Sequence, residues 1–235
     1  MPRRICLGLI LALTACKPTI ILEDPEPAPR PSDPADDPLV EHEAVREAVR
    51  GYVDALARRD VEAAATHVVP ETFAFYEDLR IAALRASREQ LEAWDLMSVL
   101  MVLQIRSTVG RAKLDSVDGR GLFGIAVTEG LVGEGLEAVP LDDVWLDETR
   151  TAAQIRLEGE PIAWLRKTDA GWQMDIPEMV RLLGPAIEAV ALEQVVADGR
   201  LRTAYTLLEI GTDEYLDVAI LDGPLELEGA RKDAP

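Results

Sequence analysis

The chain has 235 residues and a formal net charge of −19 at pH 7, from 43 acidic and 24 basic side chains. Such an acidic chain is a poor candidate for binding nucleic acid or anionic lipid, because both require positive charge on the protein. Two histidines are too few for a histidine-rich metal site. No metal or cofactor is predicted, although an acid-rich surface could collect divalent cations.

Residues 1–15 have the three zones of a secretory signal. Arg3 and Arg4 supply a positive start, and an apolar run of nine residues follows over 5–13. Thr14 and Ala15 are small and lead into Cys16. Nine apolar residues are too few to span a hydrocarbon core, which takes about 20, so this segment predicts export rather than a permanent transmembrane helix.

The order Leu13-Thr14-Ala15-Cys16 resembles the lipobox of bacterial lipoproteins. The resemblance implies cleavage before Cys16, a diacylglyceryl group on its sulfur and a further acyl chain, such as palmitate, on the new N-terminus. Two or more such chains anchor a protein stably. The mature chain then has no free thiol, because Cys6 lies in the removed segment. The alternative is an ordinary secretory signal with a chance cysteine.

The predicted location is the bacterial cell envelope. Lys17, rather than an aspartate, follows Cys16, which by resemblance to the sorting rule of Gram-negative bacteria implies the outer membrane and the periplasm. Residues 16–40 predict an acidic tether that carries seven of the 15 prolines. A proline-rich tether is a semi-rigid spacer at about 3.1 Å per residue, so it holds the rest of the chain up to roughly 75 Å from the membrane.

The first half of the remaining chain predicts helices. Apolar residues recur at three- and four-residue spacing over 39–58, and Asp60 is a natural N-cap for a short helix over 61–68. A third apolar stripe covers 71–86. Ser87 and Gln90 have the capping-box pattern, which predicts the start of a longer helix that ends before Gly110. A further helix is expected over about 117–132.

The pattern changes to strands after residue 139. Alternating or β-branched runs cover 139–146, 151–157, 162–167 and 172–176, and turn residues separate the last three. This spacing predicts an antiparallel meander. Helix resumes over about 178–198, with Pro185 as a break or kink, and residues 201–221 again look helical. The fold class is therefore α+β, with N-terminal helices, a meander, a C-terminal helical extension over 181–235 and a frayed tail over 226–235.

Two segments carry a family resemblance. Residues 52–68, YVDALARRDVEAAATHV, resemble the opening helix pair of NTF2-like domains, and residues 151–176 resemble their closing meander. The resemblance implies an NTF2-like cone over 41–180. The chain departs from the family pattern in its long helical stretch over 71–132 and in the extra segment after 180.

Two motifs suggest chemistry that their surroundings disfavour. Residues 119–124 match GxGxxG, but a dinucleotide-binding turn needs a strand directly before it, and the preceding residues are polar. The segment is therefore predicted to be a glycine-loosened helix start. Residues 42–46 begin like a zinc-protease helix, but Arg46 stands where the second zinc-binding histidine is required.

The family resemblance implies candidate site residues. Enzymes with this fold place acid–base groups inside the cone, which points to Asp54 and His67, with Tyr52, Tyr76 and Trp164 as pocket-lining residues. Each also has a structural alternative. Asp54 is expected on the solvent side of its helix, His67 is expected to be partly buried near a helix end, and the aromatic residues are expected in the core.

Two hypotheses about function follow. The first is a membrane-anchored lipoprotein whose NTF2-like domain is a non-catalytic binding module for a partner protein, a glycan or a small apolar ligand. The second is a cone enzyme for proton transfer, isomerisation or hydrolysis, with His67 or Asp54 as base. An enzyme needs a closed pocket with such a group pointing into it, whereas a binding module needs a filled core and an exposed patch.

Overall fold

The computed structural model describes residues 38–133, 140–194, 198–212 and 215–225, and the structural statements below concern these residues. The predicted signal, Cys16, most of the tether and the tail over 226–235 lie outside them. Positions 38–40, where the predicted tether overlaps the helix predicted from 39, are the first residues of a helix, so the tether prediction extends too far at its end.

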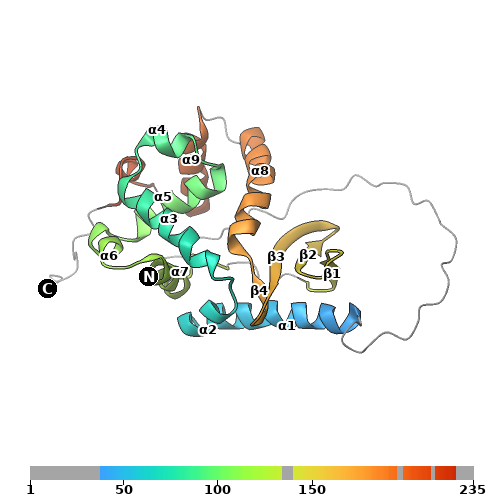
Figure 1. Cartoon of the computed structure of the whole chain (residues 1–235). Coiled ribbons are helices and arrows are strands. Elements are labelled where there is room, and N and C mark those ends of the chain that lie inside the picture. The colour runs from blue at the N-terminus through green and yellow to red at the C-terminus, as the bar shows by residue number, and fades with distance from the viewer. Residues whose placement is uncertain (1–37, 134–139, 195–197, 213–214, 226–235) are drawn as a thin grey trace.

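The chain is α+β, with helices before and after one antiparallel sheet (Figure 1). Before the sheet come α1 (Pro38–Ala57), α2 (Val61–Thr66), α3 (Glu71–Arg85), α4 (Arg88–Glu92), α5 (Leu96–Thr108), α6 (Arg111–Asp115) and α7 (Gly119–Glu129). The strands are β1 (Asp143–Leu146), β2 (Ala152–Leu157), β3 (Glu160–Thr168) and β4 (Gly171–Met174). After them come α8 (Ile176–Gln194), α9 (Arg200–Thr212) and a 3-10 helix, η4 (Val218–Leu221). This order confirms the predicted α+β class, with helices first, an antiparallel sheet next and further helices after it.

The short-range capping signals are confirmed. The Asp60 carboxylate accepts a hydrogen bond from the Ala63 N–H at 3.0 Å and starts α2. Ser87 and Gln90 form both bonds of a capping box at the start of α4. Such caps satisfy amide donors that the first turn of a helix leaves without partners.

The single long helix predicted after Ser87 is wrong. Helix α4 ends at Glu92, and the Asp95 carboxylate accepts a bond from the Ser98 N–H at 2.9 Å, which starts α5 as a separate helix. The helix predicted over 117–132 is shorter than expected, because Gly130 adopts the left-handed conformation that ends α7 (φ 71°).

The helices after the sheet differ in detail from the prediction. Helix α8 begins at Ile176 and contains Pro185 within its length. The predicted helix over 201–221 is two elements, because α9 ends at Thr212 and η4 begins only after Asp217. The Asp217 carboxylate accepts the Ala219 N–H at 2.9 Å and caps this second start.

The meander predicted over 151–176 is confirmed as β2, β3 and β4, and β1 pairs with β2 as a fourth strand, in the order β1-β2-β3-β4. One face packs against α1. On this inner face the Trp172 indole N–H donates to Glu41 of α1 at 2.8 Å, and Lys167, which lies opposite Trp172 in the register, forms an ion pair with the same carboxylate at 2.5 Å. The outer face is the other side of the same sheet.

The β4 edge of the sheet is covered by the connection between α2 and α3. The Met174 N–H donates to the His67 carbonyl at 2.8 Å, and the Val69 N–H donates to the Met174 carbonyl at 3.0 Å. Val68 thereby forms a parallel bridge to Met174. Only the β1 edge is left without such a bridge among the described residues.

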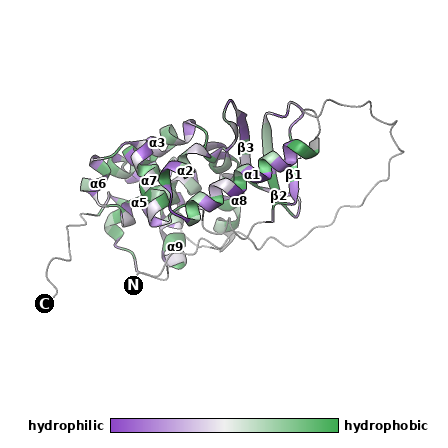
Figure 2. Cartoon of the chain, turned by 90° about the horizontal axis from the view of Figure 1, so that it is seen from below, coloured by the Kyte–Doolittle hydropathy of each residue, from purple (hydrophilic) through white to green (hydrophobic). Residues whose placement is uncertain are grey.

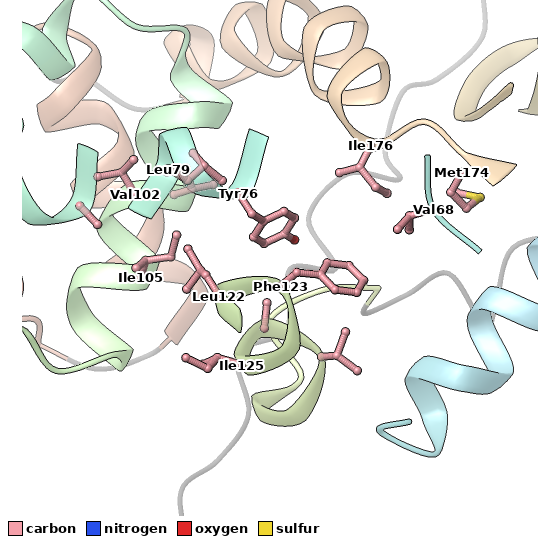
Figure 3. Packing of buried hydrophobic residues seen from close by; sticks show 14 of the residues in the cluster. Val68, Tyr76, Leu79, Val102, Ile105, Leu122, Phe123, Ile125, Met174 and Ile176 are labelled. Carbon is pink, nitrogen blue, oxygen red and sulfur yellow. The ribbon is translucent and has the colours of Figure 1, made fainter. Parts of the chain in front are cut away.

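One hydrophobic core runs from α1 to η4. Figure 3 shows Tyr76 of α3 and Phe123 of α7 at its centre, with Met174 and Val68 toward the sheet. The two rings meet edge to face at 5.4 Å between centroids. Helix α8 contacts β3 on one side and α5 on the other, so it joins the sheet to the helical end (Figure 1).

Arg106 of α5 is completely buried and holds the helical end together. Its five guanidinium hydrogens donate to five carbonyls at 2.7 to 3.1 Å, from Ala82, Ala83, Ala86, Ile220 and Leu221. These carbonyls lie at the C-terminal ends of α3 and η4, where helix dipoles favour a cation.

Among the described helices, none is both long enough and apolar enough to cross a membrane. Figure 2 shows polar and apolar residues interleaved along α1 and α8. Both helices therefore have the amphipathic character of elements that pack one side against a core.

Candidate functional site

The two predicted acid–base residues lie on different elements. Asp54 is exposed on α1. His67 is the C-cap of α2 and is half-buried. Its ring lies against the backbone of Gly51, since a β-carbon at that glycine would come within 2.5 Å of the imidazole Cε1. This burial lowers the pKa of His67 below its ordinary value. No hydrogen bond or ion pair joins Asp54 to His67 in the described part of the chain.

Tyr52 and Tyr76 are core residues, each 2% exposed. Burial raises the pKa of both phenols well above the ordinary value, and the two are close enough to influence one another. Their rings contribute apolar packing, and Tyr76 meets Phe75 and Phe123 edge to face. These residues fill the interior, as their structural alternative predicted.

Trp164 lies apart from both tyrosines. It faces Gln154 across β2 and β3, on the outer face of the sheet, whereas Tyr52 belongs to α1 on the inner face. Trp164 is 6% exposed, and its indole N–H has no hydrogen-bond partner among the residues that the structure describes. The three predicted lining residues are thus not gathered around one space.

In the described part of the chain, the helical end has at least two hollows. One is lined by residues 108–110, Ala112, Lys113, Ile125 and Glu129, and the other lies between α4, α9 and η4. Neither is lined by Asp54, His67, Tyr52, Tyr76 or Trp164. Within the described ranges, no three His, Cys, Asp or Glu side chains gather as a metal site would require. Cys16, the predicted lipidation site, lies outside these ranges.

The GxGxxG segment, residues 119–124, is the N-terminal half of α7, so it is a helix start, as predicted. A helix, α6, precedes it rather than a strand. Asp118 caps the helix by accepting the Gly121 N–H at 2.8 Å. A β-carbon at Gly119 would lie 2.2 Å from the Phe73 carbonyl oxygen. The first glycine therefore permits α7 to approach the backbone of α3, which is a packing role.

A group that the sequence reasoning missed lies on the outer face near β1. Trp145, Gln154 and Arg156, here called the outer-face cluster, are neighbours across β1 and β2. Trp145 is 39% exposed, and the Arg156 guanidinium lies 4.8 Å from its ring centroid. Two Arg156 nitrogens donate to the Gln154 side-chain oxygen at 2.9 and 3.0 Å. The cluster is therefore a pre-positioned aromatic and cationic surface.

The β1–β2 turn beside this cluster is held by Asp147. Its carboxylate accepts the amides of Thr151 and Ala152 at 2.8 and 2.9 Å. The hydroxyl of Thr149 and these amides lower the pKa of Asp147 to about 2, so it is charged at neutral pH. The turn fixes the register that places Trp145 opposite Gln154.

The outer-face cluster could be predicted only if the register of β1 against β2 were known. Alternation alone places Gln154 and Arg156 on one face of a strand. Their pairing with Trp145 depends on the turn over 147–151, and a slip of one residue would move Trp145 to the other face.

No protein-family model, curated protein or solved structure matches the chain. We therefore infer function from the geometry of the site and from the sequence patterns described above.

Proposed function

We propose that this protein is an exported, membrane-anchored lipoprotein whose α+β domain is a non-catalytic binding module for a partner protein. The observation that carries the binding part is the outer-face cluster. Trp and Arg are the residues most enriched among those that dominate binding energy at protein interfaces. Here Trp145 is exposed while Arg156 is already held against it, so little side-chain freedom is lost on binding.

The anchoring part rests on the zones of residues 1–15 and on Cys16 at their end. Lipid on Cys16 and the proline-rich segment after it would hold the domain off a membrane of the bacterial cell envelope. Lys17 favours the outer membrane. Cleavage before Cys16 removes two arginines and no acids, so the mature net charge is −21, which disfavours contact with anionic lipid.

We also propose that residues 41–180 are an NTF2-like domain. An opening helix pair, α1 and α2, and a closing antiparallel meander support this assignment. The helices α3 to α7 and the C-terminal elements are additions to that pattern, and they share its core.

Binding is favoured over the acid–base alternative because the described residues do not bring that chemistry together. Asp54 is exposed, and the His67 ring is laid against Gly51. A general base requires a position from which it reaches a bound substrate. Tyr52 and Tyr76 are packed in the core, and neither of the two hollows in the described part of the chain is lined by Asp54 or His67.

Co-purification of the whole anchored chain tests the binding part. We compare the native chain with Trp145→Ala and with Ile81→Ala, a matched control that truncates a similarly exposed apolar side chain on α3. A partner protein should be retained by the native chain and by Ile81→Ala, and lost at least tenfold in Trp145→Ala. Equal retention by all three chains, or no retained protein, would overturn the proposal.

A further inference from the structure

Along the β1 edge of the sheet, some main-chain groups have no hydrogen-bond partner among the described residues. The Asp147 N–H donates to the Ala152 carbonyl at 3.0 Å, which marks 147 and 152 as a hydrogen-bonded pair. Such pairs alternate along an antiparallel ladder, so the main chains of 143 and 145 also point toward β2. The N–H and C=O groups of Val144 and Leu146 therefore point outward, where no other described strand is placed.

Acidic residues flank this edge at both ends. The sequence over 142–148 is Asp-Asp-Val-Trp-Leu-Asp-Glu, an apolar centre between two acidic pairs. Asp142, Asp143 and Glu148 are exposed. The nearby cations are engaged, since Arg46 pairs with Glu43 and donates to the Leu141 carbonyl, and Arg156 is held by Gln154.

This charge pattern disfavours pairing between two copies of the chain. In a two-fold antiparallel pair centred on Trp145, Asp143 would face Asp147 of the second copy. Asp142 would likewise face Glu148 of that copy. Like charges directly opposite one another are destabilising, and charged residues on edge strands are a common protection against self-association.

We propose that β1 is the docking edge for an extended segment of a partner protein that carries Lys or Arg on both sides of a short apolar run. The segment would add to the sheet as a fifth strand, antiparallel to β1. Its main chain would bond to Val144 and Leu146, its apolar side chains would reach Trp145, and its cations would lie near the two acidic pairs. Strand addition of this kind obtains affinity from main-chain bonds and specificity from alternate side chains.

This inference rests on the proposed binding function and deepens it by naming the partner's chemistry. An open sheet edge is complementary to a polypeptide backbone. A second strand matches the spacing of these alternating N–H and C=O groups, whereas a glycan or a small apolar ligand does not have that repeat. The net charge of −19 further favours a basic partner.

The probe is a phage-displayed library of random nine-residue peptides, selected on the whole chain in detergent. Two variants discriminate the edge from the rest of the surface. Leu146→Pro removes the outward-pointing N–H but spares the bonds to β2, and proline is tolerated at such edge positions. Leu146→Ala is the matched control, because it also truncates the side chain but keeps the N–H. Circular dichroism and thermal unfolding establish that both variants fold.

We expect enriched peptides with basic residues around alternating apolar ones. Their affinity should fall about tenfold or more in Leu146→Pro and change less than threefold in Leu146→Ala. Hydrogen exchange at the Val144 and Leu146 amides should slow when peptide binds. Peptides without basic flanks, unchanged exchange, equal binding to both variants, or failure of any peptide to enrich would each overturn the proposal.

Two other results distinguish docking of a basic segment at the β1 edge from the broader proposal that the domain is a binding module. Sedimentation of the native chain as a dimer that Leu146→Pro converts to a monomer would show that the edge pairs with a second copy, and would contradict the basic-partner proposal. A partner that depends on Trp145 but is unaffected by Leu146→Pro would overturn docking at the edge while leaving the binding module intact.

Discussion

Arg106 uses all five donors of its guanidinium to join segments that are far apart in the sequence. Burial lowers its pKa to about 10, so the side chain is still cationic at neutral pH. The carbonyl ends of α3 and η4 compensate the buried charge. The sequence alone does not reveal this role, because an arginine near the end of an apolar helix equally fits a solvent-exposed position.

Replacing Arg106 with Met should lower the free energy of unfolding by about 3 kcal/mol or more, because five buried carbonyls lose a partner and each such loss is costly. Arg106→Lys should lose less, since an ammonium supplies three donors. Urea unfolding measures both values. Arg85→Met, at an exposed position of α3, is the control. A loss below about 1 kcal/mol for Arg106→Met would contradict the assigned role.

His67 gives the fold a pH dependence of known sign. Its pKa is lowered in the folded state, so the unfolded chain binds the proton more tightly. The contribution of His67 to stability is present above the unfolded pKa, near 6.5, and is lost as pH falls toward the folded pKa. The native chain should therefore lose more stability between pH 7 and pH 5 than His67→Gln in parallel denaturant titrations. Equal losses would show that folding does not disfavour the charged form of the His67 imidazole.

Sequence reasoning succeeded at residues whose partners are close in the chain. Asp60 and Ser87 bind amides three residues ahead, so their patterns are complete within a short window. It failed to find the outer-face cluster and Arg106, because their partners are determined by register or by distant segments. The candidates Tyr52, Tyr76 and Trp164 were chosen as aromatic residues, but the faces on which they lie depend on how the elements pack.

At the scale of elements, the contact between α7 and α3 depends on one glycine. Gly119→Ala would place a β-carbon 2.2 Å from the Phe73 carbonyl and 2.6 Å from the Glu77 amide nitrogen. The helices must separate, which should destabilise the fold by about 1–3 kcal/mol despite the higher helix propensity of alanine. Gly124→Ala in the same helix meets only the Val61 side chain, at 3.1 Å, which a shift of a few tenths of an ångström relieves, so it should cost much less than Gly119→Ala. Thermal unfolding of both variants checks this, and equal effects would refute the close-approach explanation.

The meander was the most predictable element group, because hairpin strands pair with their chain neighbours and their turns are short. The helical end was less predictable. Asp95 and Asp217 each cap a new helix inside a stretch whose apolar periodicity predicts one continuous helix. When only the sequence is read, this periodicity outweighs the cap signal. The α+β class can therefore be predicted from the sequence, whereas the helix boundaries can be located only in the structure.

In the molecule as a whole, the proposed lipid anchor and the folded domain are separate parts of the chain with different roles. Cys16→Ser should move the protein from the membrane fraction to the soluble fraction, because no described helix can cross a membrane and the lipid would be lost. Fractionation followed by immunodetection measures the change. The thermal unfolding of the domain should be unaltered. Continued membrane retention would contradict the lipid anchor.

Site-specific photo-crosslinking in cells tests the central proposal, a binding surface at β1 and the outer-face cluster, most directly. A photo-reactive amino acid replaces Asp143, or Ile81 of α3 as the control, in the anchored chain. We expect a protease-sensitive adduct from position 143 that is absent from position 81 and disappears when Trp145 is also replaced by Ala. Equal adducts from the two positions, or no protein adduct from position 143, would contradict it.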